Sequence, residues 1–236
     1  MSYRMWVELA SHIREMGANE AVKVLLLEGQ GEQAFVSGAD ISEFEAMRDC
    51  GDKAEVYDAA VDTAISQVLK FPKPVISKIR GICFGGGLAL ALASDIRIAD
   101  TRSTFALPAA RLGIGYRFNW LRRMVNLLGE TVAADLIFTG RAIDAAEALH
   151  LRLVNRVIDG QVINKEVEGY CAIITSNAPL SIAAAKSGIN MLRDGTPSED
   201  ANNAIRALIH RCAASNDYKE GIRAFKERRS PIFHGR

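Results

Sequence analysis

Residues 71–87 read FPKPVISKIRGICFGGG, and this stretch predicts a strand, a turn and a helix in succession. Pro72 and Pro74 end the helical pattern that precedes them. The apolar run at 75–79 is typical of a buried strand. The three glycines at the end of the stretch open a second run, GGLALALAS, whose composition predicts a buried helix.

The same alternation of helix and strand continues on both sides of this stretch. We expect helices at 6–16 and 55–69 and strands at 22–27 and 96–99. Such alternation predicts an α/β domain with parallel strands and right-handed crossovers. From about residue 164 the pattern becomes almost wholly helical, with expected helices at 167–175, 181–192, 201–213 and 218–228.

Composition and charge restrict the possible partners. The chain has 236 residues, 49% hydrophobic and 24% charged, which is typical of a globular protein. Its 29 basic and 28 acidic side chains give a net charge of +1, so we expect neither nucleic acid nor a membrane as a partner. No run approaches the roughly 18 apolar residues of a membrane span, and no secretory signal is recognisable.

The cysteines point to a reducing compartment. Cys50, Cys83, Cys171 and Cys212 stand far apart without a CxxC pair, which argues against a zinc cluster and against a disulfide scaffold. We therefore expect a cytoplasmic protein without a metal site.

Two loops place small residues directly after an apparent strand, where backbone amides can approach a ligand. They read FVSGADI at 35–41 and GICFGGG at 81–87. The second loop also opens a helix, whose first amides suit an anion or a developing oxyanion. The alternative is that its glycines only permit tight packing of strand and helix. The order GxGxxG of a dinucleotide site, the GK[ST] of a phosphate loop and the GxSxG of a nucleophile elbow are all missing.

Taken together, these loops resemble the enoyl-CoA hydratase/isomerase (crotonase) superfamily. The resemblance rests on GADIxEF at 38–44 and FPKPVIxxIRGxxxGGG at 71–87, and on four later motifs: SDIRIAD at 94–100, FTGRAIDAAEA at 138–148, LVNRVID at 153–159 and DYKEGIRAFKERRSPIF at 217–233. It implies a crotonase (ClpP-like) spiral fold of repeated ββα units in residues 1–160. It also implies a helical oligomerisation region in residues 161–236, and a homotrimer or a dimer of trimers.

Members of the superfamily normally have a strand pair before the first helix, whereas residues 1–6 begin within the lead-in to that helix. Either the gene start has been placed too late, or the domain lacks those strands.

The resemblance also implies roles for single residues. The backbone amides of Ala39 and Gly86 would form an oxyanion hole for the carbonyl of an acyl-CoA substrate. The coenzyme A channel would be lined by Val36, Ser37, Asp40, Ile41 and Ser42. Arg228 and Arg229, with Lys226, resemble the basic cluster that meets the coenzyme's phosphates, although a solvated helix end explains them as well. No cofactor is expected beyond the coenzyme A of the substrate.

Two substitutions separate the chain from ordinary hydratases. Ala89 and Ala109 stand where hydratases of the family carry the two glutamates that act on water. Alanine cannot transfer a proton, and general acid–base catalysis contributes about 10²- to 10⁴-fold per group. We therefore expect an enzyme, a lyase of this family, that stabilises a thioester enolate but does not hydrate by the usual route.

Two alternatives remain open. The first is a malonyl-type decarboxylase, because Tyr116 lies where methylmalonyl-CoA decarboxylases have a tyrosine. Those enzymes, however, carry a histidine at the position of Ala39 and a glutamate at that of Ala89, and a buried tyrosine is often only a packing residue. The second is a non-catalytic coenzyme A-binding or assembly protein.

Other polar residues near the motifs are explained as easily by surface solvation; they are Asp40, Glu43, Arg117 and Asn119. Cys83 is expected to be a core residue, because no histidine is placed by sequence to activate it.

Overall fold

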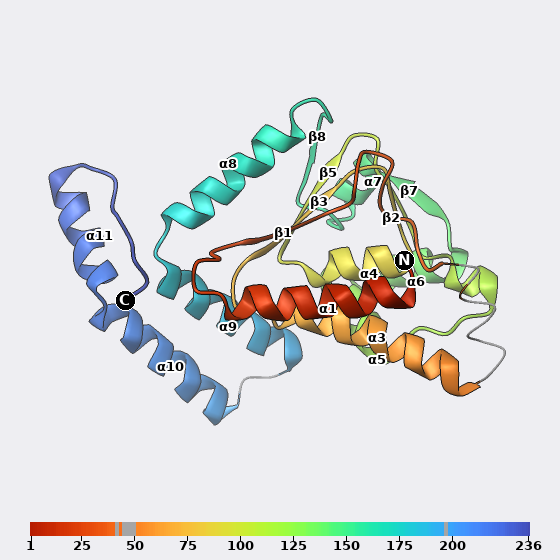
Figure 1. Cartoon of the computed structure of the whole chain (residues 1–236), viewed down its shortest axis with the longest axis horizontal. Coiled ribbons are helices and arrows are strands. Elements are labelled where there is room, and N and C mark those ends of the chain that lie inside the picture. The colour runs from red at the N-terminus through yellow and green to blue at the C-terminus, as the bar shows by residue number, and fades with distance from the viewer. Residues whose placement is uncertain (41–42, 44–50, 196–197) are drawn as a thin grey trace.

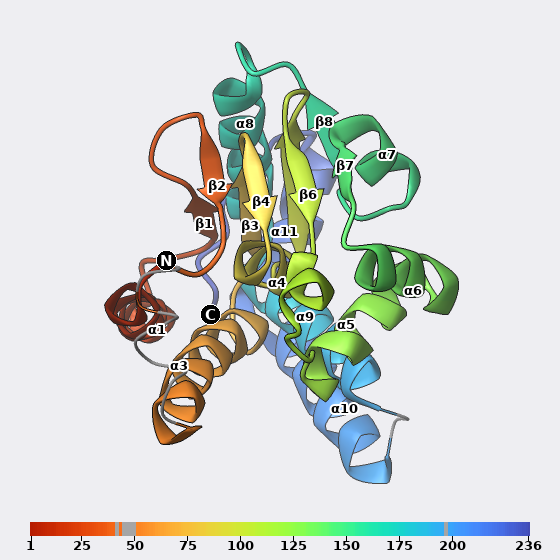
Figure 2. The same ribbon diagram turned by 90° about the vertical axis from the view of Figure 1, so that its right-hand side faces the viewer.

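The chain folds around two four-stranded sheets in a computed structural model that describes residues 1–40, 43, 51–195 and 198–236. One sheet has the order β1-β3-β5-β8 and consists of Leu25–Glu28, Val75–Ile79, Ile96–Asp100 and Arg156–Ile158. The other has the order β2-β4-β6-β7 and consists of Ala34–Val36, Ile82–Phe84, Thr104–Ala106 and Ala142–Asp144. Figure 2 views the molecule with β2, β4, β6 and β7 side by side.

Each successive ββα unit contributes its first strand to one sheet and its second strand to the other. β1 and β2 precede α3 (Gly51–Leu69), and β3 and β4 precede α4 (Gly86–Ala93). β5 and β6 precede the short 3₁₀ helix η1 (Pro108–Leu112) and α5 (Phe118–Leu128). Neighbouring strands of these three units are parallel in both sheets, and only the pair β6–β7 is antiparallel among the strands described. The predicted spiral of ββα units is confirmed.

The sequence pattern missed the second strand of each unit. β2, β4 and β6 are three residues long each, which is too short for an alternating pattern to stand out. The strand expected at 22–27 begins only at Leu25, whose amide donates to the carbonyl of Pro74 at 2.9 Å. Pairing with β3 starts at Val75, directly after that proline.

The main core lies between the sheets and the helices α1 (Tyr3–Ala18), α3 and α4. Trp6 and Ile13 of α1 are buried in it, and every residue of α4 after Gly86 is buried. A smaller cluster joins β3, β5 and β8 to α8 (Ile163–Ser176) through apolar side chains that include Ile76, Ile98 and Ile163. α6 (Glu130–Thr139) and α7 (Ala145–His150) flank β7.

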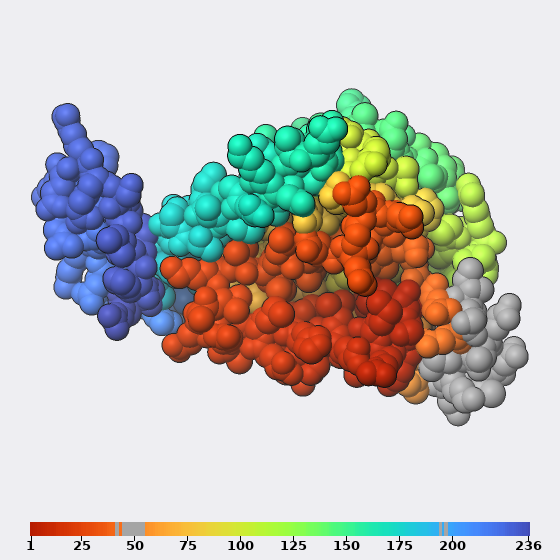
Figure 3. Space-filling view, turned by 45° about the horizontal axis from the view of Figure 1, so that its top comes forward, coloured from red at the N-terminus to blue at the C-terminus, as the bar shows by residue number. Residues whose placement is uncertain are grey.

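The last three helices are α9 (Pro179–Asp194), α10 (Glu199–Ala214) and α11 (Asn216–Glu227). α9 is fastened to the core by Lys186, whose ammonium donates to the carbonyl of Lys73 at 2.5 Å and to Asp95 at 2.7 Å. α10 has no buried residue, and α10 and α11 project from the rest of the molecule (Figures 1 and 3). A division of the chain at residue 160 stays a prediction. No helix in the described part of the chain has the length and apolarity needed to cross a membrane.

Candidate active site

The two glycine-containing loops meet at one edge of the second sheet. β2 and β4 are parallel and in register through Ala34 with Ile82, so the segments that follow them leave the sheet at the same edge. A Cβ atom added to Gly85 would lie 4.0 Å from the Cα of Gly38. A Cβ added to Gly87 would lie 2.4 Å from the carbonyl oxygen of Val36, closer than real Cβ contacts come. The loops therefore touch backbone to backbone.

Each loop presents one amide at this contact. Gly86 is the first residue of α4, so its amide has no acceptor within the helix. Ala39 follows Gly38, whose φ of 120° turns the chain in a way that favours glycine. Within the described residues, neither amide donates a hydrogen bond. Ala39 and Gly86 line the same cavity of about 290 Å³, which we call the loop cavity.

An aromatic pair from two helices forms part of the wall of the loop cavity. The indole of Trp6 packs so closely on Gly86 that a Cβ there would lie 3.0 Å from the ring. Trp6 Nε1 donates to the hydroxyl of Tyr57 at 3.1 Å, and this hydroxyl donates to the carbonyl of Met1 at 3.1 Å. Burial raises the pKa of Tyr57, which keeps the phenol neutral.

The two alanines lie in different cavities. Ala109 lines the loop cavity. Ala89, which is buried, lines a second cavity of about 550 Å³ between α3, α4 and α5, which we call the rear cavity. Asp62, Tyr116 and Trp120 line both cavities. Neither alanine position offers a proton-transferring side chain, as the sequence predicted.

Tyr116 reaches the loop cavity with its hydroxyl already engaged. It donates to the carbonyl of Leu107 at 2.7 Å and accepts from the amide of Ala109 at 3.3 Å. Burial raises the pKa of the phenol, against a smaller opposing effect of the Ala109 amide. The hydroxyl is thus neutral and held against the segment that carries Ala109.

Two carboxylates that the sequence analysis passed over also line the loop cavity. Asp58 and Asp62 stand one helical turn apart on α3, and the guanidinium of Arg117 reaches both. The Nη2 of Arg117 lies 3.3 Å from Oδ2 of Asp58, and its Nη1 forms a short ion pair with Asp62. Burial raises the pKa of Asp62, and the ion pair with Arg117 opposes that shift. The i,i+4 spacing of the two aspartates on a predicted helix was the available signal. It does not show whether that face of the helix borders a cavity.

The residues expected to line the coenzyme A channel divide into three groups. Ser37 lines the loop cavity, with Ala39. Val36 packs against the main core, and exposed Asp40 lies outside the lining of the loop cavity, with its amide donating to the carbonyl of Met1 at 3.0 Å. Ile41 and Ser42 lie outside the described residues.

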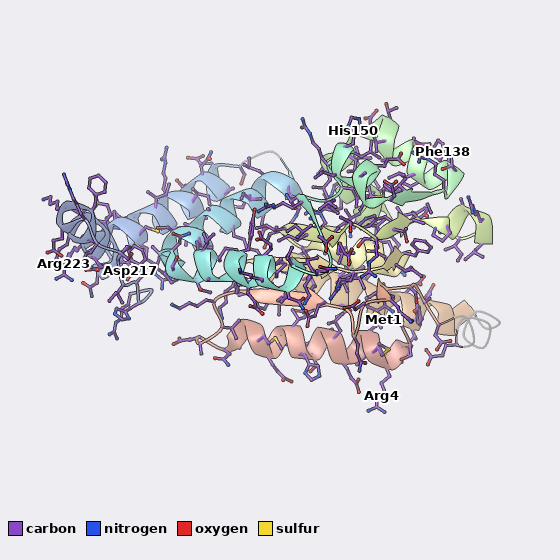
Figure 4. The ribbon with its side chains drawn as sticks, turned by 90° about the horizontal axis from the view of Figure 1, so that it is seen from above. Met1, Arg4, Phe138, His150, Asp217 and Arg223 are labelled. Atoms are coloured by element: carbon purple, nitrogen blue, oxygen red, sulfur yellow. The ribbon has the colours of Figure 1, made fainter. Side chains whose placement is uncertain are left out.

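Arg228 and Arg229 follow each other at the C-terminal end of α11, away from the loop cavity. Arg229 pairs with Glu220 and with Glu227, each at 2.6 Å, and Arg228 ends α11 in a left-handed conformation with φ of 54°. Figure 4 shows Asp217 and Arg223 of α11 far from Met1, which lies near the loop cavity. Within one chain these arginines do not reach the loop cavity, and their contact with coenzyme phosphates stays a prediction.

The remaining candidate site residues do not line the loop cavity. The carboxylate of Glu43 accepts from the amide of Tyr3 at 2.7 Å, at the start of α1. Asn119 lines the rear cavity. Cys83 has 0% of its surface exposed, and burial raises the pKa of its thiol, in agreement with a core role. No group of three or more His, Cys, Asp or Glu side chains in the described ranges is arranged to hold a metal ion.

The fold and the loop cavity define an α/β protein in which residues of two neighbouring loops, Ala39 and Gly86, line one cavity. Residues 1–236 match the family described as enoyl-CoA hydratase/isomerase, and the chain belongs to this family. The predicted crotonase membership is thereby confirmed.

Relatives of known name agree with this membership. A short-chain-enoyl-CoA hydratase of Clostridium acetobutylicum is 33% identical over 218 residues, which are 92% of this chain and 82% of that protein. A methylmalonyl-CoA decarboxylase of Escherichia coli is 29% identical over 229 residues, 97% of this chain and 87% of that protein. The crystal structure of an enoyl-CoA hydratase/carnithine racemase from Magnetospirillum magneticum superposes with a TM-score of 0.94 at 34% identity, over 100% of this chain and 87% of that one.

Proposed function

We propose that the chain binds an acyl-CoA thioester and stabilises its enolate between the amides of Ala39 and Gly86. The observation that carries this proposal is that Ala39 and Gly86 line one cavity, and that neither amide donates a hydrogen bond within the described part of the chain. One such donor is worth about 3 kcal/mol to an oxyanionic transition state. The chemistry uses coenzyme A as part of the substrate and no separate cofactor.

The missing glutamates limit the reaction. Hydration needs a group that activates water and a group that protonates the α-carbon. Ala89 and Ala109 provide neither, so the usual pair of carboxylates is not available for this step. The proposal is therefore enolate stabilisation by a lyase of this family, without ordinary hydratase activity.

Decarboxylation of a malonyl-type thioester, such as methylmalonyl-CoA, is the second candidate. Loss of CO₂ leaves the electron pair on the α-carbon, so an enolate arises without a base. Only a proton donor is then needed, and Tyr116 lines the loop cavity. To act as the donor, its hydroxyl would exchange the carbonyl of Leu107 for the substrate.

A non-catalytic coenzyme A-binding or assembly protein is the third candidate. It would keep the same cavity and the same two amides, so binding measurements alone do not separate it from an enzyme. Turnover does.

The test is a turnover assay of the purified protein on crotonyl-CoA and methylmalonyl-CoA, beside the variants Tyr116→Phe and Ala89→Glu/Ala109→Glu. Release of CO₂ by the wild type, lost in Tyr116→Phe, supports the decarboxylase. If the wild type turns over neither substrate while the double glutamate variant hydrates crotonyl-CoA, the oxyanion hole is competent, and the natural chain is a binding scaffold or acts on a different acyl-CoA.

A further inference from the structure

We propose that Asp62 is the side chain that exchanges a proton with the α-carbon of the bound thioester. This assignment rests on the proposed enolate chemistry and gives it the proton-transferring group that Ala89 and Ala109 do not supply. Asp62 belongs to α3, outside the loops and motifs that define the family resemblance. It lines both the loop cavity and the rear cavity.

The other titratable groups of the loop cavity are occupied or unsuited. The hydroxyl of Tyr57 donates to the carbonyl of Met1, and that of Tyr116 donates to the carbonyl of Leu107. Arg117 stays charged and cannot serve as a base. Among the described residues, the carboxylates that remain in the lining are Asp58 and Asp62.

The surroundings of the two carboxylates distinguish them. Asp58 lines only the loop cavity, whereas Asp62 also borders the rear cavity, together with Tyr116 and Trp120. The side chain of Asp62 is 34% exposed, so it can exchange protons with solvent between turnovers. Burial favours its neutral form, and the negative charge of Asp58 acts in the same direction. Arg117 and Trp120 favour the ionised form. A carboxyl balanced in this way suits both the uptake and the return of a proton.

The step balances without a further reactant. In enolisation, the bond from the α-carbon to hydrogen breaks and the proton bonds to the carboxylate of Asp62. The electron pair moves through the α-carbon–carbonyl bond onto the thioester oxygen, which the amides of Ala39 and Gly86 hold. After decarboxylation, the protonated carboxyl of Asp62 instead gives its proton to the α-carbon and recovers one from solvent.

Arg117 acts as a positioning residue in this arrangement. It is the N-cap residue of α5, and its guanidinium links that helix to α3 through Asp58 and Asp62. It therefore fixes the orientation of the Asp62 carboxylate and lowers its pKa. The rear cavity, which Asp62 borders, is also lined by four cationic side chains, those of Lys70, Arg122, Arg123 and Arg193.

The test measures exchange of the α-protons of butyryl-CoA in D₂O by NMR, a reaction that needs an oxyanion hole and a base but no hydration. Asp62→Asn should lower the exchange rate by about 10²-fold or more. Its dissociation constant for butyryl-CoA should stay close to that of the wild type. Asp62→Glu should recover part of the rate, and thermal unfolding checks that each variant is folded.

Two matched variants separate proton transfer from structure. Asp58→Asn removes the other carboxylate held by Arg117, and it should lower the rate less than Asp62→Asn does. Because the negative charge of Asp58 raises the pKa of Asp62, the rise of exchange with pH should move to lower pH in this variant. Arg117→Met removes a positive charge beside Asp62, so the rise of exchange with pH should move to higher pH. In Asp62→Asn this rise should disappear.

The outcomes distinguish the two proposals. Exchange by Asp62→Asn at the wild-type rate would overturn the assignment of Asp62 and leave enolate stabilisation standing. A wild-type protein that binds butyryl-CoA and methylmalonyl-CoA, but neither exchanges the first nor decarboxylates the second, would overturn both. An unchanged pH dependence in Arg117→Met would also contradict the role of Asp62.

Discussion

The hydroxyl of Tyr116 donates a hydrogen bond to the carbonyl oxygen of Leu107 at 2.7 Å. This bond holds the tyrosine against the segment that carries Leu107 and Ala109, which precede it in the chain by nine and seven residues. The phenol therefore has a structural role whether or not it transfers a proton.

Tyr116→Phe should destabilise the protein by about 1 kcal/mol, because the carbonyl of Leu107 and the amide of Ala109 lose a partner. Urea unfolding followed by fluorescence measures this loss. If Asp62 transfers the proton, α-proton exchange of butyryl-CoA should fall far less in Tyr116→Phe than in Asp62→Asn. An equal fall in both variants would favour the tyrosine instead.

Gly87→Ala should destabilise the protein by about 1–3 kcal/mol, because the new methyl group would collide with the carbonyl oxygen of Val36. It should also weaken enolate stabilisation by pushing the two loops apart. Gly169→Ala is the control, since nothing lies within 4 Å of its added Cβ. In the middle of α8 it should stabilise by roughly 0.5–1 kcal/mol. Equal stability of the Gly87 variant and the wild type would contradict the tight loop contact.

Lys186→Met should lower the free energy of unfolding by about 1–3 kcal/mol, since Asp95 loses a charged donor. Burial lowers the pKa of Lys186, so the folded state releases this proton at lower pH than the unfolded state does. The unfolded state then binds more protons between the two pKa values, and stability contributed by this group rises with pH there. The difference in stability between wild type and variant, measured across the alkaline range below the ordinary lysine pKa, should show this slope.

The projecting helices should assemble into a homotrimer or a dimer of trimers. α10 buries none of its residues, and Ile209, Ile222 and Phe225 on α10 and α11 are exposed. Light scattering after size exclusion measures the assembly, and Ile209→Asp should shift it to smaller species. Met16→Asp, which changes an exposed residue on α1, is the control. A wild-type monomer would contradict this prediction.

The two terminal arginines should have separable effects. Arg229 and Arg223 hold the pKa of Glu220 well below its usual range, and Glu220 also accepts from the amide of Ile232. Arg229→Gln should therefore loosen the C-terminal tail and speed its cleavage in limited proteolysis. Arg228→Gln should leave the tail protected, and it should weaken coenzyme A binding if this arginine meets the phosphates in the assembled protein. Unchanged affinity of Arg228→Gln for coenzyme A would favour the alternative that this arginine only forms a solvated helix end.

Local patterns in the sequence were sufficient for the long elements. The helix expected at 55–69 lies within α3, and the strand expected at 75–79 coincides with β3. The loops with Ala39 and Gly86 were also predicted, because small residues after strands leave a recognisable signature. Their adjacency follows from the parallel pairing of β2 and β4.

The missed features depend on contacts between distant parts of the chain. β2 is three residues long and owes its existence to its pairing with β4, which no local pattern of that length reveals. Asp62 was missed because its partner, Arg117, stands 55 positions later. Periodicity predicts that a helix has a polar face, but packing decides which polar residues border a cavity.

The contact of Gly38 with Gly85 has a consequence for how this protein could change its reaction. The spacing of the two amides is set by main-chain atoms, whereas proton transfer depends on side chains that other segments contribute. In the proposed site, the absence of the two glutamates therefore leaves the two amide donors in place. A new reaction could arise by replacing residues on α3 or after β6, without any change in the backbone that spaces the proposed oxyanion hole.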